Sequence, residues 1–163
     1  MHTVYLLLGS NKGNRHKLLL LARYFIQQMG GEVLGTSAIY KTEAWGNTKQ
    51  PAYLNQALLI KTDRSPFQLL KSLQKIEKML GRVNKHNYAA RTIDIDILFY
   101  DNTVIQAKNL EIPHPRLHLR NFTLQPLLEL NKSYTHPVLQ TSIEDLAKDC
   151  ADTMKVSIFV PGK

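Results

Sequence analysis

Hydrophobic positions along the chain follow two periods, one typical of β-strands and one typical of α-helices. Short apolar runs predict four strands, at residues 3–8, 32–40, 53–62 and 91–99. Between the first two, apolar residues recur at helical spacing, namely Leu18, Leu21, Ala22, Phe25 and Met29. Asn14 is a candidate N-cap for this helix, and Gly30-Gly31 is expected to end it.

A second helix is predicted between the third and fourth strands. Ser65 suits the N-cap, Pro66 suits the first helical position, and Gln68 can close a capping box. The apolar stripe of this helix consists of Leu69, Leu70, Leu73, Ile76, Met79 and Leu80. Gly81 follows the stripe, so we expect the helix to end there.

The remaining segments complete the predicted order of elements. Asp101-Asn102 indicates a hairpin turn, so residues 103–105 are expected to pair back on the fourth strand. Beyond Pro113 the pattern indicates loops and short helices, most clearly at residues 143–150. The order is β-α-β-β-α-β with a C-terminal extension, which predicts an α+β ferredoxin-like sandwich. A length of 163 residues fits a single domain, residues 1–163.

Two acidic residues interrupt the apolar run of the fourth strand. Because side chains alternate along a strand, Asp94 and Asp96 share one face, and Ile93, Ile95 and Ile97 share the other. Two carboxylates about 7 Å apart beside an apolar core repel each other and favour a divalent cation such as Mg²⁺. Arg91 adds a guanidinium suited to phosphate. The segment suggests phosphoryl-type transfer from a magnesium nucleotide. Asp-x-Asp taken alone more often marks a solvated acidic face of an edge strand, because matches this short are common by chance.

Composition narrows the classes of protein that fit. The chain carries a net charge of +8, which attracts polyanions such as nucleotides, RNA or anionic membranes. The positive charge is spread along the chain, so a nucleic-acid-binding tail is not expected. No apolar run is long enough to cross a bilayer, the N-terminus does not resemble a signal peptide, and Cys150 is the single cysteine. These features predict a cytoplasmic protein without disulfides.

Several short motifs occur together in a fixed order along the chain. They are Gly9-Ser10-Asn11, Tyr53-x-Asn55, Gln74-x-x-Glu77, Gly81-Arg82-Val83, Arg91-Thr92-Ile93-Asp94-Ile95-Asp96, Pro113-His114 and Arg120-x-Phe122. This set resembles the 6-hydroxymethyl-7,8-dihydropterin pyrophosphokinase family over residues 2–160. The resemblance implies transfer of the diphosphoryl group of ATP to the hydroxymethyl group of a reduced pterin, with release of AMP, in folate biosynthesis.

The resemblance also implies roles for individual residues. Asp94 and Asp96 would hold two Mg²⁺ ions, and Arg82 and Arg91 would supply positive charge to the migrating group. The residues implied for ATP binding are Gln74, Glu77, Lys85, Tyr88, Ile97 (through its backbone), His114 and Arg120. Those implied for pterin binding are Thr42, Trp45, Tyr53, Asn55, Asp94 and Phe122. We expect a monomer that binds ATP and 6-hydroxymethyl-7,8-dihydropterin but neither nucleic acid nor a membrane.

The chain departs from the family pattern chiefly between Arg82 and Arg91. This loop is one residue shorter than in the best-known form, and Asn84 stands where that form has a second arginine. Tyr88 replaces a tryptophan, and Trp45 occupies a position often filled by a smaller residue. Losing an arginine removes a phosphate contact, so we expect altered loop dynamics and slower turnover.

Two other functions share part of the pattern. Nucleotidyltransferases also combine Gly-Ser with Asp-x-Asp, but there the acid pair follows closely, whereas here more than eighty residues separate Ser10 from Asp94. An RNA-binding module on a ferredoxin-like sheet would fit the basic pI. However, the aromatic pattern of such modules is absent, and two acids on a central strand would repel phosphate.

Overall fold

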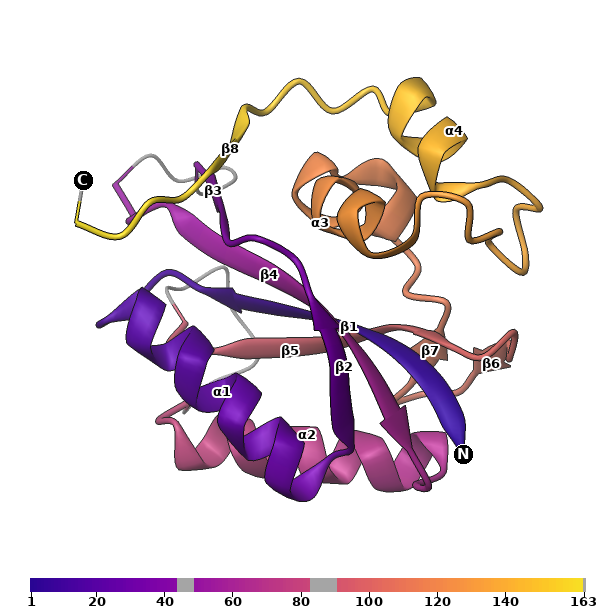
Figure 1. Ribbon diagram of the computed structural model, residues 1–163, viewed down its shortest axis with the longest axis horizontal. Coiled ribbons are helices and arrows are strands. Elements are labelled where there is room, and N and C mark those ends of the chain that lie inside the picture. The colour runs from indigo at the N-terminus through magenta and orange to yellow at the C-terminus, as the bar shows by residue number, and fades with distance from the viewer. Residues whose placement is uncertain (44–48, 83–90, 163) are drawn as a thin grey trace.

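The computed structural model describes residues 1–43, 49–82 and 91–162. Its main sheet is antiparallel and has β1 (His2–Ser10) between β4 (Tyr53–Thr62) and β5 (Asp94–Tyr100). On the other edge of β4, β2 (Glu32–Thr36) and β3 (Tyr40–Thr42) pair with successive stretches of that strand. β8 (Val156–Ile158) adds to β3 on its outer side (Figure 1).

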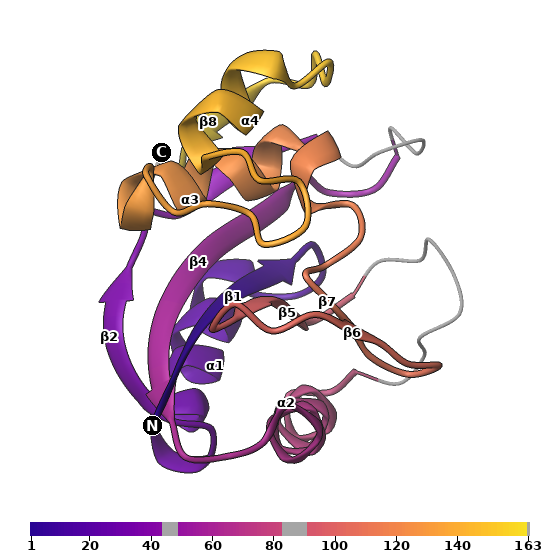
Figure 2. The same ribbon diagram turned by 90° about the vertical axis from the view of Figure 1, so that its right-hand side faces the viewer.

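Helices cover both faces of this sheet. α1 (Arg15–Met29) and α2 (Pro66–Met79) lie on one face, and α3 (Asn121–Asn131) and α4 (Ile143–Asp149) lie on the other (Figure 2). A short 3₁₀ turn (Leu117–Leu119) leads into α3, and β6 (Ile105–Gln106) pairs with β7 (Glu111–Ile112) in a separate ribbon. The predicted β-α-β-β-α-β order and α+β ferredoxin-like class are confirmed. None of the described helices is long and apolar enough to cross a membrane.

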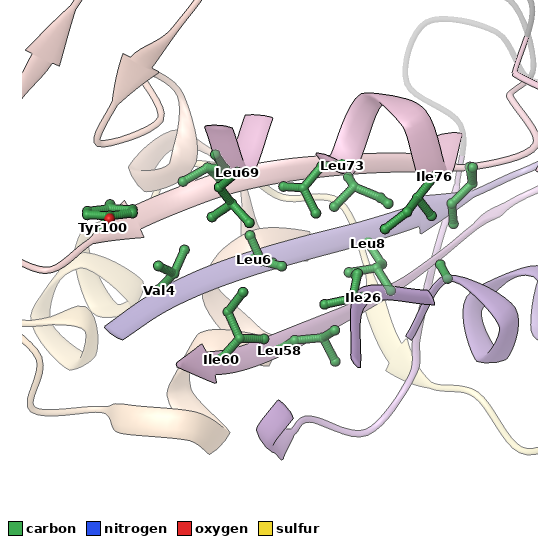
Figure 3. Close-up of a cluster of buried hydrophobic side chains, with 14 of the residues drawn as sticks. Val4, Leu6, Leu8, Ile26, Leu58, Ile60, Leu69, Leu73, Ile76 and Tyr100 are labelled. Carbon is green, nitrogen blue, oxygen red and sulfur yellow. The ribbon is translucent and has the colours of Figure 1, made fainter. Parts of the chain in front are cut away.

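The central strand is apolar at almost every position because both of its faces are buried. Val4, Leu6 and Leu8 belong to the cluster beneath α1 and α2, which Figure 3 shows in close-up. Tyr5 and Leu7 belong to a second cluster beneath α3 and α4. A strand with helices on both sides is selected for a continuous apolar run, not for alternation. β1 is therefore a rigid base for the residues at its end.

The predicted helix starts are confirmed. The side chain of Asn14 accepts a hydrogen bond from the backbone N–H of Lys17 (3.1 Å). Ser65 Oγ accepts from the N–H of Gln68 (3.3 Å), and Gln68 Oε1 accepts from the N–H of Ser65 (2.9 Å). These bonds satisfy donors that a helix leaves unpaired in its first turn.

Two predictions about strands need correction. The strand expected at residues 32–40 is divided into β2 and β3, because residues 37–39 leave the strand pairing and Ser37 Oγ accepts from Ala57 N (2.9 Å). Within β2 the register with β4 also shifts between Val33 and Gly35. Residues 103–105 do not pair back on β5. The outer edge of β5 receives the segment after β7 instead, where the N–H of His114 donates to Leu98 O (3.0 Å).

The region after Pro113 contains more structure than its pattern indicated. α4 confirms the helix expected at residues 143–150, but α3 is longer than expected and carries Pro126 in its interior. Proline lacks an N–H and lowers the apparent helical tendency of a sequence. β8 is only three residues long and was not predicted.

Candidate functional site

A cavity of about 660 Å³ lies where β1 ends and where β4 and β5 begin. Gly9 is paired with Asn55 on one side and with Asp94 on the other, so this glycine lies between the two polar side chains. The lining residues are Leu7, Gly9, Thr42, Glu43, Gln50, Tyr53, Asn55, Arg91, Asp94, Asp96, Arg116, Leu119, Arg120, Phe122, Asp152 and Met154. Sheet register, helix α3 and the C-terminal segment thus build one cavity.

The acid pair lies on the cavity face of β5, as its alternation predicts. Asp94 and Asp96 are half-buried and line the cavity, whereas Ile93, Ile95 and Ile97 are buried. Burial of the carboxyl group, with the nearby charges of Asp94 and Glu77, raises the pKa of Asp96 well above its usual range. The arrangement favours binding of a cation because a cation would relieve this repulsion.

Two arginines hold the Asp94 carboxylate at both oxygens. Arg82 Nη1 lies 2.5 Å from Asp94 Oδ1, and Arg91 Nη1 lies 3.0 Å from Asp94 Oδ2. Arg82 also pairs with Glu77, which is only 3% exposed and accepts a hydrogen bond from the N–H of Ile95 (3.1 Å). Glu77 therefore orients Arg82 and the start of β5 from the protein interior. The site combines fixed positive and negative groups at short range.

The carboxylates fit a hard divalent cation. Carboxylate oxygens are preferred ligands of Mg²⁺, which usually keeps other positions for water and substrate phosphates. Among the described residues, no group of three or more His, Cys, Asp or Glu side chains could hold a metal. Two protein carboxylates with phosphate and water would therefore complete the shell, and this is the usual arrangement where magnesium accompanies a nucleotide.

The part of the cavity formed by β3, β4 and α3 offers buried polar atoms without a partner among the described residues, together with aromatic side chains. Asn55 is 4% exposed and donates to Leu8 O (3.2 Å), while its Oδ1 has no partner within the described part of the chain. Thr42 Oγ1 is likewise buried without a partner among the described residues. Tyr53 and Phe122 supply rings to the same cavity. A flat heterocycle with an amide edge suits such a surface.

Gly9 has a steric role in this arrangement. A Cβ atom at this position would lie 2.7 Å from Asn55 Nδ2. Such a contact is too short, so any side chain would displace the asparagine. The Gly9-Ser10-Asn11 motif thus permits Asn55 to approach β1.

The structure brings many of the predicted site residues together. Those that line the cavity are Thr42, Tyr53, Asn55, Arg91, Asp94, Asp96, Arg120 and Phe122. Arg82 and Glu77 contact the residues of the cavity indirectly. Arg82 forms ion pairs with Asp94 and Glu77, and Glu77 accepts a hydrogen bond from the N–H of Ile95 in β5. Trp45, Lys85 and Tyr88, together with Asn84, lie outside the described residues.

Besides Glu77, three residues predicted to contact ATP do not line this cavity. Gln74 lies half-buried on α2, and Ile97 is 5% exposed in the apolar core. His114 lies in a neighbouring cavity of about 170 Å³. Burial, together with the charges of Arg120 and Arg116, lowers the pKa of His114 to about 4. Their nucleotide contacts stay predictions.

Some lining residues were not singled out from the sequence. Arg116 is exposed in the cavity, and its guanidinium has no ion-pair partner within the described residues. Gln50 precedes β4, and Asp152 and Met154 arrive from the C-terminal segment. Gln50 and Arg116 each lie within a few residues of a recognised motif, which is a weak signal. Asp152 lies 56 positions after Asp96 in a segment without a motif, so only the fold reveals its place.

Comparisons with known proteins agree with this geometry. Residues 5–132 match the family model described as 7,8-dihydro-6-hydroxymethylpterin-pyrophosphokinase. A relative from Aquifex aeolicus, named 2-amino-4-hydroxy-6-hydroxymethyldihydropteridine pyrophosphokinase, is 39% identical over 145 residues, which are 89% of this chain and 90% of that protein. A relative of the same name from Haemophilus influenzae is 38% identical over 97% of this chain and 99% of its own length.

Two further similarities involve longer proteins. The folic acid synthesis protein fol1 of Pneumocystis carinii is 42% identical over 91% of this chain, but the match spans only 20% of fol1. The crystal structure of Plasmodium falciparum HPPK-DHPS A437G with STZ-DHP superposes with a TM-score of 0.74 at 17% identity. That match covers 90% of this chain and 45% of the Plasmodium chain. At this identity the likeness concerns the fold.

Proposed function

The chain belongs to the 7,8-dihydro-6-hydroxymethylpterin-pyrophosphokinase family, and from this premise we propose how its residues divide the reaction between them. The reaction is transfer of the diphosphoryl group of ATP to the hydroxymethyl group of 6-hydroxymethyl-7,8-dihydropterin in folate synthesis. One observation carries the assignment: the acid pair and the unpaired polar atoms of Asn55 and Thr42 face the same cavity.

The pterin binds between β4 and α3. Tyr53 and Phe122 pack against the ring, and Asn55 Oδ1 accepts a hydrogen bond from the ring's amino or amide edge. Leaving this buried oxygen unpaired costs about 1–3 kcal/mol, and the pterin restores the missing partner. The hydroxymethyl group then points toward Asp94 and Asp96 on the neighbouring part of the sheet.

The acid pair binds the magnesium form of ATP. Asp94 and Asp96 would hold two Mg²⁺ ions, which would neutralise the triphosphate and lower the pKa of the pterin hydroxyl. Arg82 and Arg91 are already fixed by Asp94 and Glu77, so little reorganisation is needed when negative charge develops. Arg116 and Arg120 also line the cavity, where they bind phosphate oxygens.

The bond changes follow from this placement. The pterin hydroxymethyl oxygen attacks the β-phosphorus of ATP, and the bond between that phosphorus and the oxygen bridging to the α-phosphorus breaks. AMP leaves with that oxygen, and the hydroxyl proton passes to solvent. No side chain forms a covalent intermediate, because positioning and charge neutralisation account for most of the catalysis of phosphoryl transfer.

The direct test is AMP release from ATP with Mg²⁺, measured with and without 6-hydroxymethyl-7,8-dihydropterin. We expect AMP only when the pterin is present, in a one-to-one ratio with diphosphorylated pterin. AMP release that ignores the pterin, or nucleotide transferred to an acceptor, would contradict the proposed function. Omission of Mg²⁺ should abolish turnover because the carboxylates would then repel the triphosphate.

A further inference from the structure

Asn11 directly follows β1 and is completely buried, with 0% of its surface exposed. Its side chain uses both ends of the amide. Asn11 Oδ1 accepts from the N–H of Arg91 (2.7 Å), and Asn11 Nδ2 donates to Gln50 Oε1 (3.0 Å). Its backbone N–H also donates to Arg91 O (3.1 Å). One residue thus holds two segments that are distant in the sequence.

These two segments lead into the two halves of the cavity. Gln50 precedes β4, which carries Tyr53 and Asn55, and Gln50 itself lines the cavity. Arg91 precedes β5, lines the cavity and pairs with Asp94. The asparagine therefore lies between the surface assigned to the pterin and the group assigned to the diphosphoryl transfer.

The chemistry of the amide explains why this position suits asparagine. A neutral amide carries a donor and an acceptor on adjacent atoms, so it satisfies an N–H on one side and a carbonyl-type oxygen on the other. A carboxylate offers no donor, and an apolar side chain of the same shape offers neither group. Since the site is buried, a group left without its partner cannot turn to water instead.

We propose that Asn11 is a positioning residue that sets the pterin pocket and the diphosphoryl-transfer site relative to each other. This inference rests on the proposed function. The side chain acts by fixing Gln50 and the backbone of Arg91, without touching either substrate. Its removal therefore weakens binding on both sides of the cavity at once.

Arg15 provides a matched control for this idea. Its Nη1 donates to Ala52 O (2.6 Å), so Arg15 also fixes the segment that enters β4. Within the part of the chain that the structure describes, no hydrogen bond or ion pair joins Arg15 to the segment that enters β5. A variant at Arg15 should therefore disturb only the pterin side.

The experiment measures the Kd of 6-hydroxymethyl-7,8-dihydropterin and of a non-hydrolysable ATP analogue with Mg²⁺, each by calorimetry on folded protein. We expect Asn11→Leu to raise both Kd values about tenfold, and Arg15→Leu to raise only that of the pterin. An unchanged Kd for either ligand in Asn11→Leu would overturn the proposal. A wild-type protein that releases no pterin-dependent AMP would refute the proposed function instead, so the two failures are distinguishable.

A double-mutant cycle tests the contact itself and does not depend on the stability of Asn11→Leu. Asn11→Asp keeps the acceptor for the N–H of Arg91 but loses the donor to Gln50 Oε1. Gln50→Glu still accepts from Asn11 Nδ2. The double variant places two carboxylates opposite each other, so we expect it to lose at least about tenfold more in kcat/KM than the product of the two single effects. Effects that simply multiply would overturn the proposal.

Discussion

At the scale of single residues, Asp96 differs from Asp94 and Glu77 in that no arginine among the described residues forms an ion pair with it. Asp94 is held by Arg82 and Arg91, whereas the pKa of Asp96 is raised by burial and by nearby carboxylates. Asp96 is thus the less favourable carboxylate in the free protein and the one that gains most from a metal ion. Asp94 is therefore the carboxylate that the arginines fix, and Asp96 is the carboxylate whose charge a metal ion would stabilise most.

Asp96→Asn should therefore separate activity from stability. We expect kcat to fall by at least about a hundredfold, because a metal ligand is lost, while the melting temperature stays the same or rises because a repelling charge is removed. Asp63→Asn, at an exposed position on the surface, serves as the control and should leave both quantities unchanged. Near-normal turnover by the Asp96 variant would exclude a metal-binding role for this residue.

The approach between Gly9 and Asn55 supports a second prediction at this scale. Gly9→Ala would place Cβ 2.7 Å from Asn55 Nδ2 and push that side chain out of position. We expect the KM for the pterin to rise about tenfold or more, with a much smaller change for ATP. In Gly35→Ala the new Cβ would meet Leu130 Cδ2 at an ordinary 3.6 Å, so this control should behave like the wild type. Equal steady-state kinetics for both variants would contradict the assignment of Asn55.

Arg116 carries a prediction that arises from the structure alone. Its guanidinium lines the cavity without an ion-pair partner among the described residues, and the chain lacks one arginine of the resembled family pattern at Asn84. Arg116→Gln should raise the KM for ATP several-fold and leave the pterin Kd unchanged, since only a phosphate contact is removed. Lys108→Gln removes an exposed charge elsewhere and should have no such effect on initial-rate kinetics.

At the scale of elements, helix α3 begins without a side-chain cap of its own. Asp152 replaces the missing cap from a distant segment, because its Oδ2 accepts from Asn121 N (3.0 Å) and its backbone O accepts from Asn121 Nδ2 (2.7 Å). The Oδ1 atom meanwhile accepts from Met154 N (2.9 Å). Asp152 thereby holds the start of the helix that presents Arg120 and Phe122 to the cavity.

Asp152→Ala is expected to loosen this junction. Loss of the cap should lower the free energy of unfolding by about 1 kcal/mol and raise the KM for the pterin, because the position of Phe122 is no longer fixed. Asp149→Ala, at an exposed position near the end of α4, is the matched control. Chemical denaturation together with pterin titration distinguishes the two variants. An unchanged pterin KM in Asp152→Ala would mean that the cap serves stability alone.

The same elements show what the sequence could predict. The starts of α1 and α2 and the boundaries of β4 were accurate because capping residues and short-range periodicity determine them locally. The division of β2 from β3, and the pairing of β6 with β7, depend on neighbours far away in the sequence. Likewise the alternation of side chains along β5 predicted that Asp94 and Asp96 share one face. The contributions of Asn11 and Asp152 could not be predicted in this way, because they depend on hydrogen bonds to Arg91 and Asn121, which are distant in the sequence.

At the scale of the whole molecule, one sheet separates two apolar clusters, and the site lies at one end of that sheet. β1 contributes to both clusters and is paired with both strands that carry site residues. A change at its end is therefore transmitted to both walls of the cavity. This arrangement explains how a cavity built from distant segments keeps a defined geometry without a disulfide, since the single cysteine, Cys150, is free.

Two partly buried histidines make the stability of the whole chain depend on pH. Burial lowers the pKa of His114 to about 4 and lowers the pKa of His136 below its usual value. In the unfolded chain both titrate near 6.5, so between about pH 4 and 6.5 the unfolded state binds more protons than the folded state. Stability is then fully present above about pH 6.5 and is lost as the pH falls toward 4.

Urea denaturation at a series of pH values tests this dependence. We expect the free energy of unfolding to fall between pH 7.5 and 5, with His114 contributing about 1–2 kcal/mol of the loss after allowance for its partial exposure. His114→Gln should remove part of that loss, because glutamine cannot take up a proton in this pH range. The raised pKa of Asp96 acts on the total curve in the opposite direction, so the comparison of His114→Gln with the wild type decides. A loss in His114→Gln as large as that of the wild type would show that the His114 imidazole is accessible to water in the folded protein.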